Sequence, residues 1–233
     1  MSIKYIFIVL GEPYSVFSEI LGKYFSRTKN IKKKIVVLGN INLLKNQLGK
    51  LNYKINFNEI SHLNEAKFKE INIININFSK KDIFSKITNK SNKYIEDSFN
   101  KFFELSKLNN KNYLLINGPV SKKTFLKKKY LGITEYLSNK SRSKDTVMLI
   151  YNKKLSVSPI TTHLPIKYVA KYIDKEKIVK NIIKINNFFK STLNEKGKFA
   201  ILGLNPHCET VDTFSEEDKI IIPAIKILKK KKS

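Results

Sequence analysis

Cysteine, tryptophan and long apolar runs are nearly absent from this sequence of 233 residues, and each absence excludes a class of protein. The single cysteine, Cys208, cannot form an intrachain disulfide, so we expect a reducing, cytoplasmic setting. No apolar stretch approaches the roughly 20 residues that a membrane-spanning helix requires, so we expect no membrane partner. The apolar run Tyr5–Leu10 is followed at once by Gly11-Glu12-Pro13, without a signal-peptide cleavage site. It therefore predicts a first buried strand.

Arginine is also scarce, although the chain is strongly basic. The formal net charge is +26, yet Arg27 and Arg142 are the only arginines. Base readout and bidentate phosphate contacts favour the planar guanidinium, and the lysines are dispersed along the whole chain. This charge is more typical of solvated faces than of a nucleic-acid-binding surface, and a basic nucleic-acid binder is kept only as an alternative.

Glycine is too sparse for the familiar nucleotide-binding loops. There are eight glycines, and no two of them are separated by a single residue. The sequence therefore contains neither the G-x-G-x-x-G dinucleotide turn nor the G-x-x-x-x-G-K-[ST] phosphate loop. If the protein binds NAD, it does so without the Rossmann turn.

What the sequence does contain is an alternation of short β-branched runs with amphipathic segments. Strands that are apolar on both faces and alternate with helices indicate an α/β fold with a mixed, largely parallel sheet flanked by helices. The predicted strands are Tyr5–Leu10, Ile35–Leu38, Tyr53–Phe57, Ile71–Phe78, Tyr113–Asn117, Val147–Tyr151, Leu155–Thr161 and Phe199–Leu202. The predicted helices are Val16–Phe25, Ile41–Leu48, Tyr94–Ser106, Glu176–Phe189 and Ser215–Leu228.

The domain organisation is less sharply marked. We interpret residues 1–233 as one region, with a possible lobe boundary near residue 117 and a return to the first lobe late in the chain. The boundary rests on Asn117-Gly118-Pro119, which ends a predicted strand abruptly and predicts a turn that opens a functional loop.

Two of the three histidines are candidate metal ligands. His163 and His207 each follow a predicted strand, and each has a proline nearby. The carboxyl ends of parallel strands are where open α/β sheets place their ligands, and neutral imidazole is a common ligand of Zn²⁺. A structural or solvated role stays open for both, and His62 is interpreted as a surface histidine.

Other polar residues near the Gly-Pro turn could bind a substrate. Lys122 suits a phosphate or carboxylate, and Thr134 suits a hydroxyl group. Lysine is so common here that Lys122 could equally be a solvated side chain. The acidic residues Glu216 and Glu217 begin a predicted helix, where stabilisation of the helix dipole is a sufficient explanation.

Five blocks of this sequence, in the same order, resemble motifs of the 4-hydroxythreonine-4-phosphate dehydrogenase family. The resemblance covers essentially the whole chain, loosely in its first third. The blocks are Asn117-Gly118-Pro119-Val120-Ser121-Lys122 for T-G-P-x-x-K, Gly132-Ile133-Thr134-Glu135-Tyr136-Leu137 for G-H-T-E-[YF]-[LF], Thr161-Thr162-His163-Leu164-Pro165 for T-T-H-[IL]-P, Leu204-Asn205-Pro206-His207 for L-N-P-H, and Glu216-Glu217 with Ile221-Ile222-Pro223 for E-E…I-I-P.

The resemblance implies an isocitrate- and isopropylmalate-dehydrogenase-like fold and a homodimer. It also implies oxidation of 4-phosphooxy-L-threonine with NAD, followed by loss of CO₂, in vitamin B6 (pyridoxine) biosynthesis. By the same resemblance, His163 and His207 are two of three ligands of a divalent metal, which could be zinc, magnesium or cobalt. Thr134 would contact the substrate beside the position of Ile133, with Lys122 in the first block. The catalytic and cofactor-binding residues stay unassigned.

The sequence departs from the family pattern in several places. The motif Y-H-D-Q-G, which carries the third metal histidine, is absent, and the chain ends in the lysines before Ser233. We therefore interpret it as a fragment, incomplete at the C-terminus, with weak or no turnover. Ile133 replaces a substrate-contacting histidine, and the first block, residues 11–19, lacks the family's inner glycines. These departures leave two alternatives, a dehydrogenase for another phosphorylated hydroxy acid and a non-catalytic binding homologue.

Overall fold

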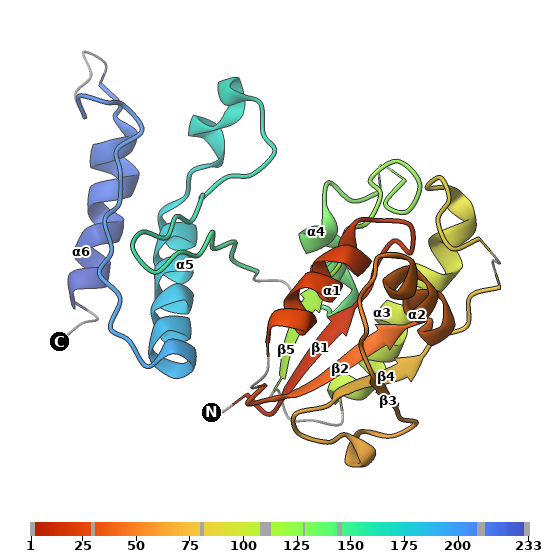
Figure 1. Cartoon of the computed structure of the whole chain (residues 1–233). Coiled ribbons are helices and arrows are strands. Elements are labelled where there is room, and N and C mark those ends of the chain that lie inside the picture. Colours follow the sequence, from red (N-terminus) through yellow and green to blue (C-terminus); the bar gives the residue numbers. More distant parts are fainter. Residues whose placement is uncertain are drawn as a thin grey trace. The chain divides into compact units, whose positions relative to one another are not determined.

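A computed structural model describes residues 3–28, 31–79, 82–107, 113–127, 129–143, 146–208 and 213–230 (Figure 1). The chain divides into two compact units, Met1–Lys144 and Asp145–Ser233. The lobe boundary that we predict near residue 117 lies inside the first unit, and the late return of the chain to the first lobe stays a prediction.

The first unit is built on a five-stranded sheet in which every pair of neighbouring strands is parallel. The strand order is β3-β4-β2-β1-β5, so β1 lies between β2 and β5. The strands are β1 (Tyr5–Val9), β2 (Lys34–Gly39), β3 (Phe57–Glu59), β4 (Ile71–Asn75) and β5 (Tyr113–Asn117). The predicted α/β fold with a parallel sheet is confirmed.

Helices cover both faces of this sheet, because successive strand side chains point to opposite sides. Ile8 and Val37 face a cluster that contains α1 and α2, whereas Phe7 and Val36 face a cluster that contains α3 and α4. Both clusters consist of buried hydrophobic side chains, and together they form the core of the unit. The helices are α1 (Phe17–Arg27), α2 (Ile41–Lys50), α3 (Asn92–Lys107) and α4 (Ile133–Lys140), with short turns η1 (Leu63–Glu65) and η2 (Asn89–Ser91).

The second unit is mainly helical in its described residues. Its core is formed by Ile178 and Val179 of α5 (Lys175–Phe188), packed against Ile221 and Ala224 around α6 (Ile222–Lys230). Asp174 caps α5 by accepting a hydrogen bond from the Lys177 amide at 2.9 Å. The shorter helical turns are η3 (Ile166–Tyr168), η4 (Ala170–Tyr172) and the π-helical turns η5 (Phe189–Leu193) and η6 (Glu217–Ile221).

Three predicted strands of the second unit are wrong. Val147–Tyr151, Leu155–Thr161 and Phe199–Leu202 form no strand, and the only pairing there is the isolated antiparallel bridge between Ile150 and Val157. A β-branched run becomes a strand only when a neighbouring strand satisfies its backbone groups and covers its side chains. In keeping with this, Leu155 and Leu202 are 74% and 83% exposed. None of the described helices has the length and apolarity to cross a membrane.

Candidate functional site

The turns that follow the neighbouring parallel strands β1 and β5 meet at very close range in the first unit. The Glu12 amide donates to the Pro119 carbonyl at 2.8 Å, and the Gly118 amide donates to the Val9 carbonyl at 2.7 Å. Gly11 has a φ of +71°, and a Cβ on Gly118 would lie 2.0 Å from the Leu10 carbonyl oxygen. Only glycine allows this approach. The two turns thus meet at the carboxyl ends of β1 and β5. The chain passes from β1 to β2 on one side of β1 and later reaches β5 on its other side, so the strand order reverses here. Such a reversal point is the usual ligand position in open α/β sheets.

Glu12 lies buried where these two turns meet. Its side chain is 2% exposed, and neither carboxylate oxygen has a hydrogen-bond partner among the described residues. Burial raises the pKa of Glu12, and the nearby Ser91 hydroxyl and Tyr14 amide offset this only in part. An unpaired buried carboxyl group is costly, and such groups concentrate where a protein binds or reacts.

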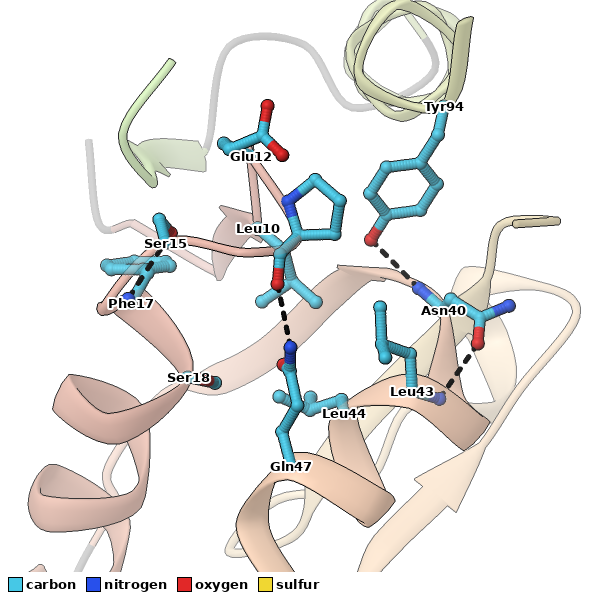
Figure 2. Close-up of a pocket in the computed structure, with 11 residues that line it drawn as sticks. Leu10, Glu12, Ser15, Phe17, Ser18, Asn40, Leu43, Leu44, Gln47 and Tyr94 are labelled. Carbon is cyan, nitrogen blue, oxygen red and sulfur yellow. Dashed lines mark hydrogen bonds between the residues drawn. The ribbon is translucent and has the colours of Figure 1, made fainter. Parts of the chain in front are cut away.

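The turn after β1 borders a small cavity of about 10 Å³, roughly the size of one water molecule. Figure 2 shows Glu12, Ser15 and Ser18 on one side of it, with Asn40 and Tyr94 opposite. The Asn40 amide donates to the Tyr94 hydroxyl at 3.0 Å, and burial raises the pKa of Tyr94 to about 12. The cavity is therefore lined by hydroxyl, amide and carboxyl groups.

Sequence reasoning missed Glu12 as a candidate. It treated residues 11–19 only as a divergent block, and not as a site. The usable signal was an acidic residue between Gly11 and Pro13 at the end of an apolar strand, because a carboxylate in that context is either at a surface turn or buried for a reason.

The predicted substrate residues lie after β5 in the first unit. Lys122 is exposed in a turn organised by Ser121, whose side-chain oxygen accepts from the Thr124 amide at 3.1 Å. Thr134 is exposed in the first turn of α4. Ile133 is partly buried and packs against the same hydrophobic cluster as the turn that follows β5. The three residues thus lie on two segments, the turn after β5 and helix α4, that pack against the same hydrophobic cluster. Their contacts with a substrate stay predictions.

The predicted metal ligands His163 and His207 both lie in the second unit, on exposed loops. Neither loop follows a strand, because the strands predicted before them are not formed, so the argument from a common sheet edge is wrong. His163 has a φ of 58°, an unusual conformation for a residue with a side chain. Their role as ligands stays a prediction.

The donor set for a metal is incomplete in the described residues. Imidazole nitrogen suits a zinc or cobalt ion, so the chemistry of both histidines fits a divalent metal. However, the described part of the chain contains no group of three His, Cys, Asp or Glu side chains arranged to hold one. Two imidazoles alone are expected to bind a metal weakly.

The loop that carries His207 is held by a carboxylate from the next helical segment. Glu217 Oε1 accepts hydrogen bonds from the amides of Leu204 at 2.7 Å and Asn205 at 2.9 Å. The Asn205 amide is the main cause of the lowered pKa of Glu217. Sequence reasoning assigned Glu217 to the helix dipole and to the E-E…I-I-P block, and it missed this contact.

Comparison with known proteins places the chain in a family. The family model "Pyridoxal phosphate biosynthetic protein PdxA" matches residues 30–233. The 4-hydroxythreonine-4-phosphate dehydrogenase of Sulfurihydrogenibium sp. (strain YO3AOP1) is 34% identical over 232 residues, which are 95% of this chain and 70% of the relative. That of Aquifex aeolicus (strain VF5) is 30% identical over 234 residues, 97% of this chain and 71% of the relative.

Solved structures have the same fold. The 4-hydroxythreonine-4-phosphate dehydrogenase of Klebsiella pneumoniae matches with a TM-score of 0.81 at 22% identity, over 98% of this chain and 73% of that chain.

A provisionally named D-threonate 4-phosphate dehydrogenase of Clostridium botulinum (strain Hall / ATCC 3502 / NCTC 13319 / Type A) is a further relative by sequence. It is 25% identical over 226 residues, 94% of this chain and 67% of the relative. The resemblance seen in the motifs is confirmed, and the chain belongs to the PdxA family of pyridoxal phosphate biosynthetic proteins.

Proposed function

We propose that the protein oxidises 4-phosphooxy-L-threonine with NAD, with loss of CO₂ from the resulting 3-oxo acid, in the synthesis of pyridoxal phosphate. The observation that carries this proposal is the family match over residues 30–233, supported by a dehydrogenase relative that is 34% identical. A homodimer is part of the same proposal, and it rests on the family resemblance alone.

The residue roles follow from the matched motifs. Lys122 supplies a positive charge for the phosphate or carboxylate, and Thr134 supplies a hydroxyl contact. Both side chains are exposed, as substrate contacts must be before binding. Ile133 can neither donate a hydrogen bond nor take a proton, so it contributes only shape at its position.

His163 and His207 are proposed as ligands of a divalent cation, which could be zinc, cobalt or magnesium. When bound, such an ion acts as a Lewis acid on a substrate oxygen. The protein's own contribution is to present two imidazoles on exposed loops of one unit. Since the described residues supply no third donor to them, we expect weak metal binding and slow turnover from residues 1–233.

Titration with Co²⁺, followed by its visible absorption, tests this metal assignment. His163→Ala and His207→Ala are each expected to weaken Co²⁺ binding at least about tenfold, because each removes a direct ligand. His62→Ala is the matched control, since it removes an exposed histidine from the first unit. Equal affinity in all three variants would contradict the assignment.

A second candidate is a dehydrogenase for another phosphorylated hydroxy acid. The specific observations in its favour are Ile133, in place of the family's histidine, and the relative named for D-threonate 4-phosphate. NADH formation should be compared between 4-phosphooxy-L-threonine and D-threonate 4-phosphate, for the natural sequence and for Ile133→His. Preference for 4-phosphooxy-L-threonine supports the first function, and preference for the threonate supports the second.

A non-catalytic binding protein is the third reading, favoured by the incomplete donor set. It predicts binding of the phosphorylated acid without NADH formation at any metal concentration. Isothermal titration with the same two acids separates it from the dehydrogenases, because a binding protein gives heat of binding where no turnover is measured.

A further inference from the structure

The Leu204–Cys208 loop, which carries His207, is held from outside by one side chain. Glu217 Oε1 accepts from the Leu204 amide at 2.7 Å and from the Asn205 amide at 2.9 Å. The second oxygen, Oε2, accepts from the Ser215 hydroxyl at 3.3 Å. Both carboxylate oxygens of Glu217 therefore accept hydrogen bonds, and the first two backbone amides of the loop are held in place by one of them.

From Asn205 the constraint passes to His207 itself. The Asn205 side-chain oxygen accepts from the His207 amide at 3.0 Å, and its backbone carbonyl accepts from the Cys208 amide at 3.0 Å. These two bonds close the turn around Pro206 and set the direction of the His207 backbone. Because His207 is exposed, the backbone is the main restraint on where its ring lies.

The holding group is itself rigid. Glu217 is 7% exposed and Ser215 is 6% exposed, so both are buried despite being polar. Glu217 opens the π-helical turn η6, and Ile221 at the end of that turn packs into the core with Ile178 of α5. A carboxylate anchored this way can fix a loop, whereas a solvated one cannot.

A glycine leaves room for this arrangement. A Cβ on Gly203 would lie 2.5 Å from the Cys208 sulfur and 3.2 Å from Glu217 Oε1. The turn therefore folds back tightly over Gly203, and Glu217 approaches it closely.

We propose that Glu217 is the positioning residue for His207, and that it acts by accepting the Leu204 and Asn205 amides rather than through its charge. The inference rests on the proposed function, in which His207 binds the metal. The rival explanation is that Glu217 only begins its helix favourably, as Glu216 does one residue earlier. The two explanations differ in what happens to His207 when the acceptor is removed.

Three substitutions separate the possibilities in the 233-residue chain. Glu217→Met keeps the length of the side chain and removes both acceptors. Glu217→Gln keeps an oxygen for the two amides and removes the charge. Glu216→Gln is the matched control, since it removes one charge at the neighbouring position.

Two measurements on these variants report on position without any metal. Amide hydrogen exchange of Leu204 and Asn205 is expected to accelerate at least about tenfold in Glu217→Met, because an unpaired amide loses its protection. The imidazole resonances of His207 are expected to shift and sharpen in the same variant. Glu217→Gln should stay within about threefold of the natural protein in exchange rate, and Glu216→Gln should be indistinguishable from it.

The consequence for function is read from Co²⁺ affinity. Glu217→Met is expected to weaken binding by roughly tenfold, the lower end of what outer-shell changes cause, with Glu217→Gln close to the natural protein. If Glu217→Met does not fold, Ser215→Ala should give a smaller change in the same direction, because it frees only Oε2.

Unchanged Leu204 and Asn205 exchange and unchanged His207 resonances in Glu217→Met would overturn the inference. So would a Glu217→Gln variant as impaired as Glu217→Met, since that outcome assigns the effect to charge. If the natural protein shows no His207-dependent Co²⁺ binding, the metal assignment within the proposed function fails, while the metal-free exchange and resonance measurements still decide the positioning role.

Discussion

Glu12 is expected to make the stability of the first unit depend on pH. Its carboxyl group is 2% exposed, its two oxygens are unpartnered within the described structure, and burial raises its pKa. A raised pKa means that the folded state holds the proton more tightly than the unfolded state. The stabilising contribution is therefore complete below the unfolded-state pKa and is lost as pH rises through the folded-state pKa.

Replacing the carboxyl by an amide removes this dependence. Glu12→Gln keeps the shape of the side chain and removes its ionisable group, so no charge can form at this buried position at any pH. A buried amide without partners costs about as much as a buried protonated carboxyl and less than a carboxylate, so Glu12→Gln is expected to stabilise the unit by on the order of 1 kcal/mol at a pH above the folded-state pKa of Glu12. The advantage should disappear under acidic conditions, where the natural side chain is protonated.

The groups that face Glu12 do not confuse this result. Tyr14 and Tyr94 have raised pKa values, Tyr94 to about 12, so they titrate only in alkaline solution. Urea unfolding should be followed through the amide signals of β1 and β5, at several pH values from acidic to neutral. Glu59→Gln is the control, because it removes an exposed carboxylate from the same unit. A Glu12→Gln variant with the same pH dependence as the natural protein would refute the reasoning.

Two further predictions concern the framework of the first unit. Gly118→Ala forces a Cβ to within 2.0 Å of a backbone oxygen and is expected to cost about 3 kcal/mol or more in urea unfolding. Gly49→Ala has nothing within 4 Å and lies in α2, so it should be neutral or stabilise by up to about 1 kcal/mol. Asn72→Leu removes a fully buried side chain that donates to three carbonyls and accepts from the Lys67 amide, an expected loss of roughly 3–5 kcal/mol. Asn58→Ala, which removes only one donor to Asn72, should cost about 1 kcal/mol, and equal losses for the two asparagine variants would contradict this.

The first unit was predictable because its apolar runs find neighbours nearby. Four of its five strands fall within a few residues of the predicted ranges. The strand predicted at Tyr53–Phe57 begins later, at Phe57, because Tyr53 serves another purpose. Its amide donates to the Leu48 carbonyl at 2.9 Å, at the end of α2, and its ring lies against Gly22 of α1. The helix α4 was not predicted, because it is only eight residues long. Its apolar residues Ile133, Tyr136 and Leu137 have helical spacing, but they span less than the window of roughly 11–18 residues over which such a pattern is recognised.

In the second unit, the spacing of apolar residues and the content of β-branched residues did not predict the strands correctly. Leu155–Thr161 has the β-branched pattern of a strand, yet it makes only the isolated bridge between Val157 and Ile150. Strand propensity measures how well side chains fit a covered, pleated surface, and that cover is a property of the neighbours rather than of the segment. The helices α5 and α6 satisfy their own backbone hydrogen bonds, which is why their positions could be predicted locally.

The family motifs stay informative despite these wrong strand predictions, because specific contacts account for the residues that can be checked. Gly118 is required by the approach of the Leu10 carbonyl oxygen, and Asn205 is required by the amide of His207. Glu217 is required by the amides of the same loop. The Gly118 contact depends on β1 lying beside β5. The contacts of Asn205 and Glu217, by contrast, need no neighbouring strand, so these two motifs stay meaningful even where the predicted sheet edge is absent. It follows that the placement of His207 should persist in the second unit whatever covers its exposed apolar residues, provided that the acceptor on Glu217 is kept.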